Sequence, residues 1–165
     1  KVTGSVCPND AGELAATGAP YVRDFSDYGF PSTYLLPKAK VKQLFFTMVA
    51  DAVDAGADAV VVELADGVLQ RETAAMIADA DIRACCAGAL LAAPCALSAM
   101  MGVEVIHRAG LDVVGVTGLI TNAPLFVREF SARSSVPVLS SARHDAELGR
   151  AVVSRLSGEA TRTAA

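Results

Sequence analysis

The stretch AVVVELADGVLQRETA, residues 59–74, decides the fold and points to a site. Its three consecutive valines, Val60–Val62, are β-branched and predict a strand that is apolar on both faces, as in a parallel sheet covered by helices. The strand ends in the carboxylate of Glu63, and an Asp66-Gly67 turn follows. Ligands of open α/β sheets bind beyond the carboxyl ends of the strands, so we expect Glu63 to lie at a ligand site. A cap or a salt bridge at the strand end is the alternative role for Glu63.

Strand and helix patterns alternate along the rest of the chain. Strands are predicted at 1–4, 21–25, 59–64, 88–93, 112–116 and 136–139, and helices at 11–17, 38–55, 72–80, 95–108, 124–132 and 144–156. This alternation predicts an α/β fold with a doubly wound, mostly parallel sheet and helices on both faces. We expect one domain over residues 1–157, followed by a small polar tail, 158–165, that frays.

Composition and charge argue against several classes of protein. The net charge is −4 and no block of Lys or Arg is present, so we expect no nucleic-acid partner. Residues 84–103 carry no formal charge, but Pro94 interrupts them, so we predict a strand, a turn and a helix there and no membrane segment. The four cysteines form no Cys-x-x-Cys pair, so we expect them to be reduced thiols. We also expect no signal peptide, and therefore a cytoplasmic location.

Three polar loops are expected to meet at one edge of the sheet, because parallel strands place the loops that follow them on the same side. The loops supply carboxylates, hydroxyls and cations. Carboxylate and hydroxyl oxygens suit magnesium, and Lys or Arg neutralises phosphate charge. The set therefore predicts a phosphate and metal site, with ordinary solvated loops as the alternative. Its members are Lys1, Thr3, Asp10, Asp27, Ser32, Thr33, Glu63, Asp66 and Arg71.

Three short segments carry a resemblance to a known family: KVTG at 1–4, VVVELADG at 60–67 and TNAP at 121–124. Together with the order of the elements, they resemble the P-loop NTPases of the dethiobiotin synthetase and molybdopterin-guanine dinucleotide accessory type, in the portion after the phosphate-binding loop. The resemblance implies that Lys1 approaches a phosphate and that Glu63 takes part in magnesium coordination. It also implies that the loop with Asn122 and Pro124 contacts the nucleotide base.

The phosphate loop that defines this family, Gly-x-x-x-x-Gly-Lys-Ser/Thr, does not occur in the 165 residues. The family places the loop ahead of the position of Lys1, so we expect it upstream of this residue. The backbone amides of such a loop carry much of the affinity for phosphate. We therefore expect the 165-residue chain to fold but to bind ATP or GTP weakly by itself.

The sequence thus predicts a nucleotide-dependent enzyme of the P-loop class, ligase-like or kinase-like, that uses ATP or GTP with Mg²⁺ on a small-molecule substrate. The alternative is a non-catalytic α/β ligand-binding or partner domain that keeps only the scaffold. Fold analogy adds a homodimer as a candidate assembly. The candidate residues are Lys1 and Glu63 for catalysis, Thr3, Asn122 and Pro124 for cofactor binding, Asp27, Ser32, Thr33 and Arg71 for substrate binding, and Glu63, Asp10 and Asp66 for the metal.

Overall fold

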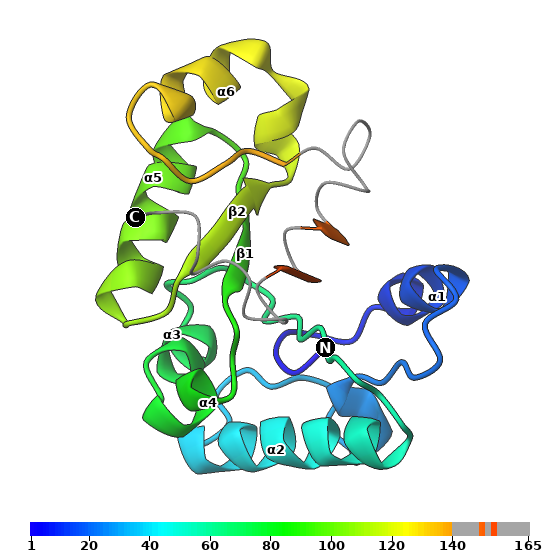
Figure 1. Cartoon of the computed structure of the whole chain (residues 1–165). Coiled ribbons are helices and arrows are strands. Elements are labelled where there is room, and N and C mark those ends of the chain that lie inside the picture. Colours follow the sequence, from blue (N-terminus) through cyan, green and yellow to red (C-terminus); the bar gives the residue numbers. More distant parts are fainter. Residues whose placement is uncertain (140–148, 151–152, 155–165) are drawn as a thin grey trace. The chain divides into compact units, whose positions relative to one another are not determined.

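The computed structural model describes residues 1–139, 149–150 and 153–154 (Figure 1). The chain divides into two compact units, Lys1–Ile82 and Arg83–Ala165, and each is described by itself. Most of the predicted helix 144–156 and all of the predicted tail 158–165 lie outside the described residues.

The helices of the first unit are α1 (Pro8–Ala16), the 3-10 helix η1 (Phe25–Tyr28), α2 (Lys38–Asp54), α3 (Arg71–Ile77) and α4 (Ala80–Ala84), which carries the boundary between the units. The long helix predicted over 38–55 is confirmed as α2. It buries side chains at the three- and four-residue spacing of an amphipathic helix: Val41, Leu44, Phe45, Met48 and Ala52. Gly56 follows with a φ of 91°, a left-handed conformation that ends helices.

The predicted strand 59–64 does not form as a strand. Leu64 alone pairs, through a parallel bridge with Thr3. Val61 is 89% exposed and Val60 is 39% exposed, so the prediction of a strand buried on both faces is wrong. A β-branched run becomes a strand only where neighbouring backbone completes its hydrogen bonds, and no described segment does so for Val60–Val62.

The strand predicted over 21–25 is also replaced, because Phe25 begins the helix η1. Asp24 precedes η1 and its carboxylate accepts a hydrogen bond from Ser26 N–H. Asp and Ser stabilise helix starts in this way, and their side chains outweigh the strand signal of the flanking aromatic residues. The first unit therefore uses short extended segments in place of full strands.

The second unit contains a βαβ motif. Strand β1 (Ala89–Ala92) leads through α5 (Ala96–Arg108) to β2 (Val113–Thr117), which lies parallel to β1. Residue Val116 of β2 also pairs in parallel with Val138, through bonds from Val116 N–H to Pro137 C=O (2.9 Å) and from Leu139 N–H to Val116 C=O (2.8 Å). The helix η2 (Leu119–Asn122) follows β2, and α6 (Pro124–Ser131) packs on α5.

Small residues allow α5 to pack closely on this sheet. A β-carbon on Gly102 of α5 would lie 2.7 Å from Cδ2 of Leu91 in β1. A β-carbon on Gly115 of β2 would lie 2.5 Å from Cδ1 of Leu139. Glycine at these two positions makes room for the leucine side chains that fill the core of the unit.

The α/β class and its parallel strands are confirmed, whereas the regular sheet of the described residues has two strands. The strand, turn and helix predicted within 84–103 are also confirmed, as β1, the turn at Pro94 and the first half of α5. Among the described helices, none combines the length and hydropathy that crossing a bilayer requires.

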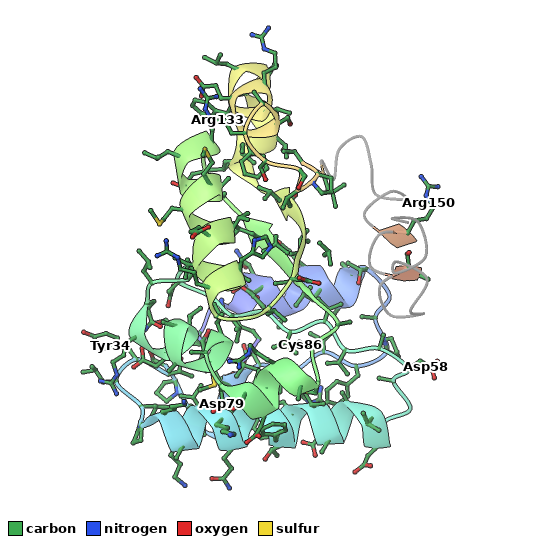
Figure 2. The ribbon with its side chains drawn as sticks, turned by 60° about the vertical axis from the view of Figure 1, so that its left-hand side comes forward. Tyr34, Asp58, Asp79, Cys86, Arg133 and Arg150 are labelled. Carbon is green, nitrogen blue, oxygen red and sulfur yellow. The ribbon has the colours of Figure 1, made fainter. Side chains whose placement is uncertain are left out.

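A buried carboxylate joins α2 to the start of α4. The Asp79 Oδ1 atom accepts hydrogen bonds from Asp81 N–H (3.1 Å) and Ile82 N–H (3.4 Å), and lies 2.9 Å from Lys42 Nζ (Figure 2). Lys38 Nζ lies 3.4 Å from the other carboxylate oxygen. The hydrogen bond from Lys42, helped by Ile82 N–H and Lys38, lowers the pKa of Asp79 to about 2. The folded state therefore favours the ionised carboxylate.

We predict that Asp79 makes the stability of the protein depend on pH in the acid range. Its contribution is complete above the ordinary aspartate pKa of about 4 and is lost as the pH falls toward about 2, because the depressed pKa belongs to the folded state. Asp79→Asn should lower the urea midpoint at pH 7 and flatten its decline between these pH values. Asp81→Asn is the control, since the Asp81 side chain is 73% exposed and its ion pair with Lys42 lies at the surface. An equal effect of the two changes would contradict this assignment.

Candidate functional site

The side chain of Lys1 lies at the centre of a charged cluster in the first unit. Its ammonium group forms an ion pair with Asp10, from the first turn of α1, and lies 3.7 Å from Oε1 of Glu63. The Lys1 side chain is 9% exposed, whereas the two carboxylates face solvent more openly. The structure therefore brings together the predicted catalytic pair, Lys1 and Glu63, with Asp10.

The charges of this cluster stabilise one another. Burial alone would lower the pKa of Lys1, but the hydrogen bond to Asp10 and the charge of Glu63 outweigh it, and the net result is a raised pKa. The hydrogen bond from Lys1 in turn lowers the pKa of Asp10. The cluster therefore holds one cation between two carboxylates.

Backbone pairing sets the position of the cluster. Val2 N–H donates to Glu63 C=O (2.9 Å), and Thr3 pairs in parallel with Leu64. Lys1 and Glu63 therefore belong to neighbouring backbone segments that run in the same direction. Asp66 follows in a turn, with a φ of 73° that is unusual for a residue other than glycine. Backbone strain of this kind collects at functional sites, which makes the Asp66 turn a candidate ligand contact.

Lys1 and Asp66 both lie close to Gly4. A β-carbon on Gly4 would lie 3.1 Å from Cε of Lys1, 3.0 Å from the β-carbon of Ala65 and 3.7 Å from Oδ2 of Asp66. The φ of Gly4 is 124°, a conformation that side chains rarely permit. Asp66 therefore lies beside the Lys1 segment, as the sequence predicted.

Thr3 is a buried residue whose hydroxyl contacts the turn that follows Glu63. The residue is buried, and its hydroxyl lies 3.4 Å from both Ala65 C=O and the hydroxyl of Thr73. Thr73 donates a stronger bond, of 2.8 Å, to the same carbonyl. These hydroxyls fix the turn that follows Glu63, so the contacts of Thr3 in this structure are with protein groups.

Two predicted substrate residues meet the first loop. Gly4 N–H donates to the hydroxyl of Thr33 (2.9 Å), and Thr33 N–H donates to Gly4 C=O (2.9 Å). The hydroxyl of Ser32 donates to the same carbonyl (3.2 Å) and lies 3.3 Å from that of Ser5. The expected meeting of the polar loops is therefore confirmed where Gly4 and Ser5 contact Ser32 and Thr33.

Asp27 and Arg71 make contacts of a different kind. The carboxylate of Asp27 accepts a hydrogen bond from Asp24 N–H (2.9 Å) and completes the capping box of η1. Arg71 is exposed, donates to Leu36 C=O (3.3 Å) and lies 3.5 Å from the carboxylate of Glu72. Asp27 thus supports local structure, while the guanidinium of Arg71 lies against the end of the loop 31–36.

The buried carboxylate of Glu72 was not identified from the sequence. Glu72 is 2% exposed, and its Oε1 accepts a hydrogen bond from Leu35 N–H (2.9 Å), while Gln70 donates to its other oxygen. Leu35 has a φ of 63°, which costs energy for a leucine. The Glu72 carboxylate therefore holds a strained turn that leaves Tyr34 70% exposed and directed away from the ribbon (Figure 2).

A glutamate in the first turn of a helix usually interacts favourably with the helix dipole. Because this role is so common, the sequence did not indicate that Glu72 accepts a hydrogen bond from Leu35 N–H. The unusual signal was Gln70 directly before the helix. Its Oε1 accepts hydrogen bonds from Glu72 N–H (2.9 Å) and Thr73 N–H (3.0 Å), the role that Ser, Thr, Asp or Asn takes at most helix starts.

The predicted base-contacting residues belong to the second unit. Asn122 ends η2, and Pro124 begins α6 at a position where its missing N–H costs nothing.

The three predicted metal ligands, Asp10, Glu63 and Asp66, belong to the first unit. Within the described part of the chain, no three His, Cys, Asp or Glu side chains form a group that would hold a metal ion. Asp10, Glu63 and Asp66 thus do not make a preassembled three-carboxylate site.

We predict that Glu72 fixes the turn 31–36. Glu72→Ala removes the acceptor of Leu35 N–H and should lower the free energy of unfolding by about 1.5–3 kcal/mol, as expected for a buried hydrogen bond to a charged group. Amide exchange at Leu35 should accelerate in the same variant. Glu72→Gln retains an acceptor oxygen and is the matched control, with a smaller effect on both quantities. Unchanged exchange at Leu35 in Glu72→Ala would refute the assigned contact.

Comparison with known proteins adds no relative to this picture. No protein-family model matches the chain, and no curated protein or solved structure matches it significantly. The resemblance to P-loop NTPases therefore stays a prediction from the sequence.

Proposed function

We propose that this chain forms the phosphate, metal and substrate side of a nucleotide-dependent enzyme of the P-loop class, which uses ATP or GTP with Mg²⁺ on a small-molecule substrate. One observation carries the proposal. The ammonium of Lys1 lies between Asp10 and Glu63, where two parallel backbone segments end and the strained Asp66 turn begins. Ligand sites of α/β proteins occupy this position relative to their strands.

Lys1 acts on the phosphate in this proposal. When an anionic ligand enters, the Lys1 ammonium exchanges part of its interaction with Asp10 for phosphate oxygens and neutralises their charge. Asp10 and Glu63 hold the ammonium close to its working position before the ligand arrives, which reduces the cost of ordering a long side chain. Ser32 and the buried Thr33 bond to the backbone of Gly4 and so fix the loop beside Lys1.

The oxygen donors of the site suit magnesium. This ion commonly takes one or two protein carboxylates and completes its coordination with waters and phosphate oxygens, so a preassembled group of three carboxylates is not required. Glu63 and Asp66 are the side chains that would hold it, because Asp10 is the closer partner of the Lys1 ammonium and Glu63 lies farther away, at 3.7 Å. When bound, the ion would neutralise charge on the phosphates.

The remaining parts of the proposal follow from the family resemblance. A Gly-x-x-x-x-Gly-Lys-Ser/Thr loop upstream of Lys1 would supply the backbone amides for the phosphates. Asn122 and Pro124 would contact the base, Arg71 and Asp27 would face the substrate, and a doubly wound sheet would join the elements. These roles are proposed together, since each depends on the same nucleotide.

The alternative function is a non-catalytic ligand-binding or partner domain. One observation favours it: the side chains of four expected ligand residues already form hydrogen bonds with protein groups, namely Thr3, Asp27, Ser32 and Thr33. Calorimetric titration with Mg-ATP and Mg-GTP, followed by a turnover assay on the same sample, separates the two functions. Binding without turnover at any candidate substrate would favour the alternative.

We predict that Glu63→Gln removes activity and spares the fold. The change keeps the shape of the side chain but removes the charge, so nucleotide turnover at saturating magnesium should fall about tenfold or more while the unfolding midpoint stays close to that of the parent. The measurement uses a chain to which the phosphate loop that this proposal requires has been joined ahead of Lys1. Glu13→Gln is the control, because Glu13 is an exposed residue of α1. Turnover of Glu63→Gln equal to that of the parent would exclude the metal role.

A further inference from the structure

Three extended segments of the first unit run side by side in the same direction. Lys1 donates from its α-amino group to Arg23 C=O (2.9 Å), and Phe25 N–H donates to Lys1 C=O (3.1 Å). Bonds from one residue to the residues before and after its partner are the pattern of parallel pairing, here with Asp24 opposite Lys1. On its other side, the Lys1–Thr3 segment pairs with Glu63 and Leu64. Lys1–Thr3 is thus the middle one of three parallel segments.

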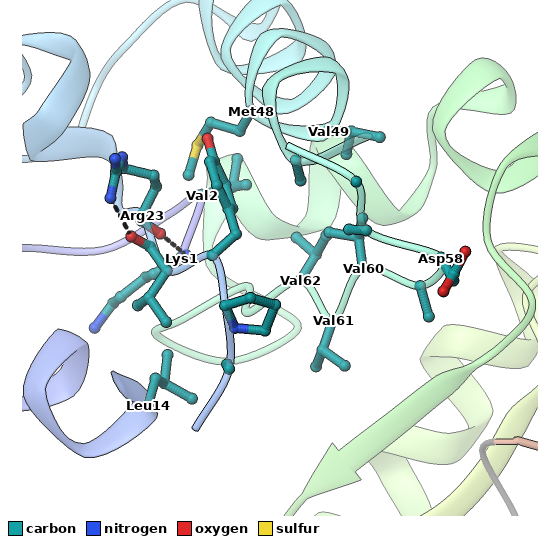
Figure 3. Close-up of a pocket in the computed structure, with 18 residues that line it drawn as sticks. Lys1, Val2, Leu14, Arg23, Met48, Val49, Asp58, Val60, Val61 and Val62 are labelled. Atoms are coloured by element: carbon teal, nitrogen blue, oxygen red, sulfur yellow. Dashed lines mark hydrogen bonds between the residues drawn. The ribbon is translucent and has the colours of Figure 1, made fainter. Parts of the chain in front are cut away.

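A cavity of about 440 Å³ lies at the amino end of this middle segment (Figure 3). Residues 20–23 line it from one flanking segment and residues 59–62 from the other, while Met48, Val49 and Ala52 contribute the apolar surface of α2. The bridge of Thr3 with Leu64 and the bond from Val2 N–H to Glu63 C=O together place Lys1 beside Val62 and Glu63. A chain continuing backward from Lys1 in the same register would pass through the cavity, beside Val61 and then Val60.

The backbone that lines the cavity is prepared for pairing on both sides. Within the described residues, the N–H and C=O groups of Val60, Val61 and Val62 make no hydrogen bond, and neither do the N–H groups of Tyr21 and Val22. An exposed row of unpaired backbone N–H and C=O groups is a template on which another strand can pair. Three consecutive β-branched residues also prefer the extended conformation that a neighbouring strand would stabilise.

We propose that this cavity is a strand-binding groove, and that its occupant is an extended apolar segment of polypeptide joined to the amino end of Lys1. The segment pairs in parallel with 59–62 on one side and with 20–22 on the other, and so extends the three-segment arrangement. Its side chains are apolar, because the groove is lined by valine, methionine, alanine and proline, and the charged groups of Lys1, Arg23 and Asp58 belong to residues at its ends. A small apolar molecule would leave both rows of backbone groups unpaired.

This inference concerns the fold of the first unit and does not rest on nucleotide binding. The test adds four residues, Val-Ile-Val-Val, ahead of Lys1 in the 165-residue chain and measures amide hydrogen exchange of Tyr21, Val22 and Val60–Val62 by NMR. A matched chain carries Gly-Ser-Gly-Ser at the same place. Exchange of these amides should slow by about tenfold or more with the apolar extension and stay near the parent rate with the Gly-Ser extension.

Two outcomes would overturn the proposal. Equal exchange in the two extended chains would show that the groove does not select an apolar strand. Protection of the parent chain by the free Val-Ile-Val-Val peptide, as strong as that given by the joined extension, would assign the groove to a separate partner. Absence of nucleotide binding in every chain would leave the exchange result intact, so failure of the proposed function is distinguishable from failure of the groove.

Discussion

Parallel pairing between Lys1–Thr3 and Glu63–Leu64 is the constraint on which the first unit depends. Once these backbones lie side by side, Lys1 meets Glu63, Thr3 meets the Ala65 carbonyl and Gly4 meets Thr33. Each hydrogen bond adds only about 0.5–1.5 kcal/mol, so no single contact holds the site. The pairing brings residues more than sixty positions apart in sequence together and lets these small contributions act at one place.

The parts of the fold that could be predicted from the sequence are those with strong local signals. The spacing of apolar residues along 38–55 defines α2, and Pro94 separates β1 from α5. The polar loops after the predicted strands indicated that Lys1 would meet Glu63, and that the segment after Lys1 would meet Ser32 and Thr33. The contact of Lys1 with Glu63 follows from parallel segments, which the alternation of strands and helices indicates, whereas Ser32 reaches Ser5 through an antiparallel bridge.

The parts that could not be predicted depend on partners that the local sequence does not show. Val60–Val62 has the composition of a buried strand, yet its conformation is decided by whether another backbone lies beside it. Glu72 has the composition of an ordinary first-turn carboxylate, and only the three-dimensional structure reveals that Leu35 N–H lies against it. Asp27 is the opposite case, because it was predicted to bind substrate and its carboxylate instead accepts the capping hydrogen bond from Asp24 N–H.

The open backbone edge at Val60–Val62 also has a consequence for handling the protein. Exposed, unpaired and valine-rich edges are templates on which other copies of a chain add strands, and natural proteins usually protect them with charge, proline or a covering segment. Here three apolar residues in succession carry no such protection, and Val61 is almost fully exposed. We therefore expect this edge to promote strand addition between copies of the 165-residue chain in concentrated solution, without any change in its helices or its charged cluster.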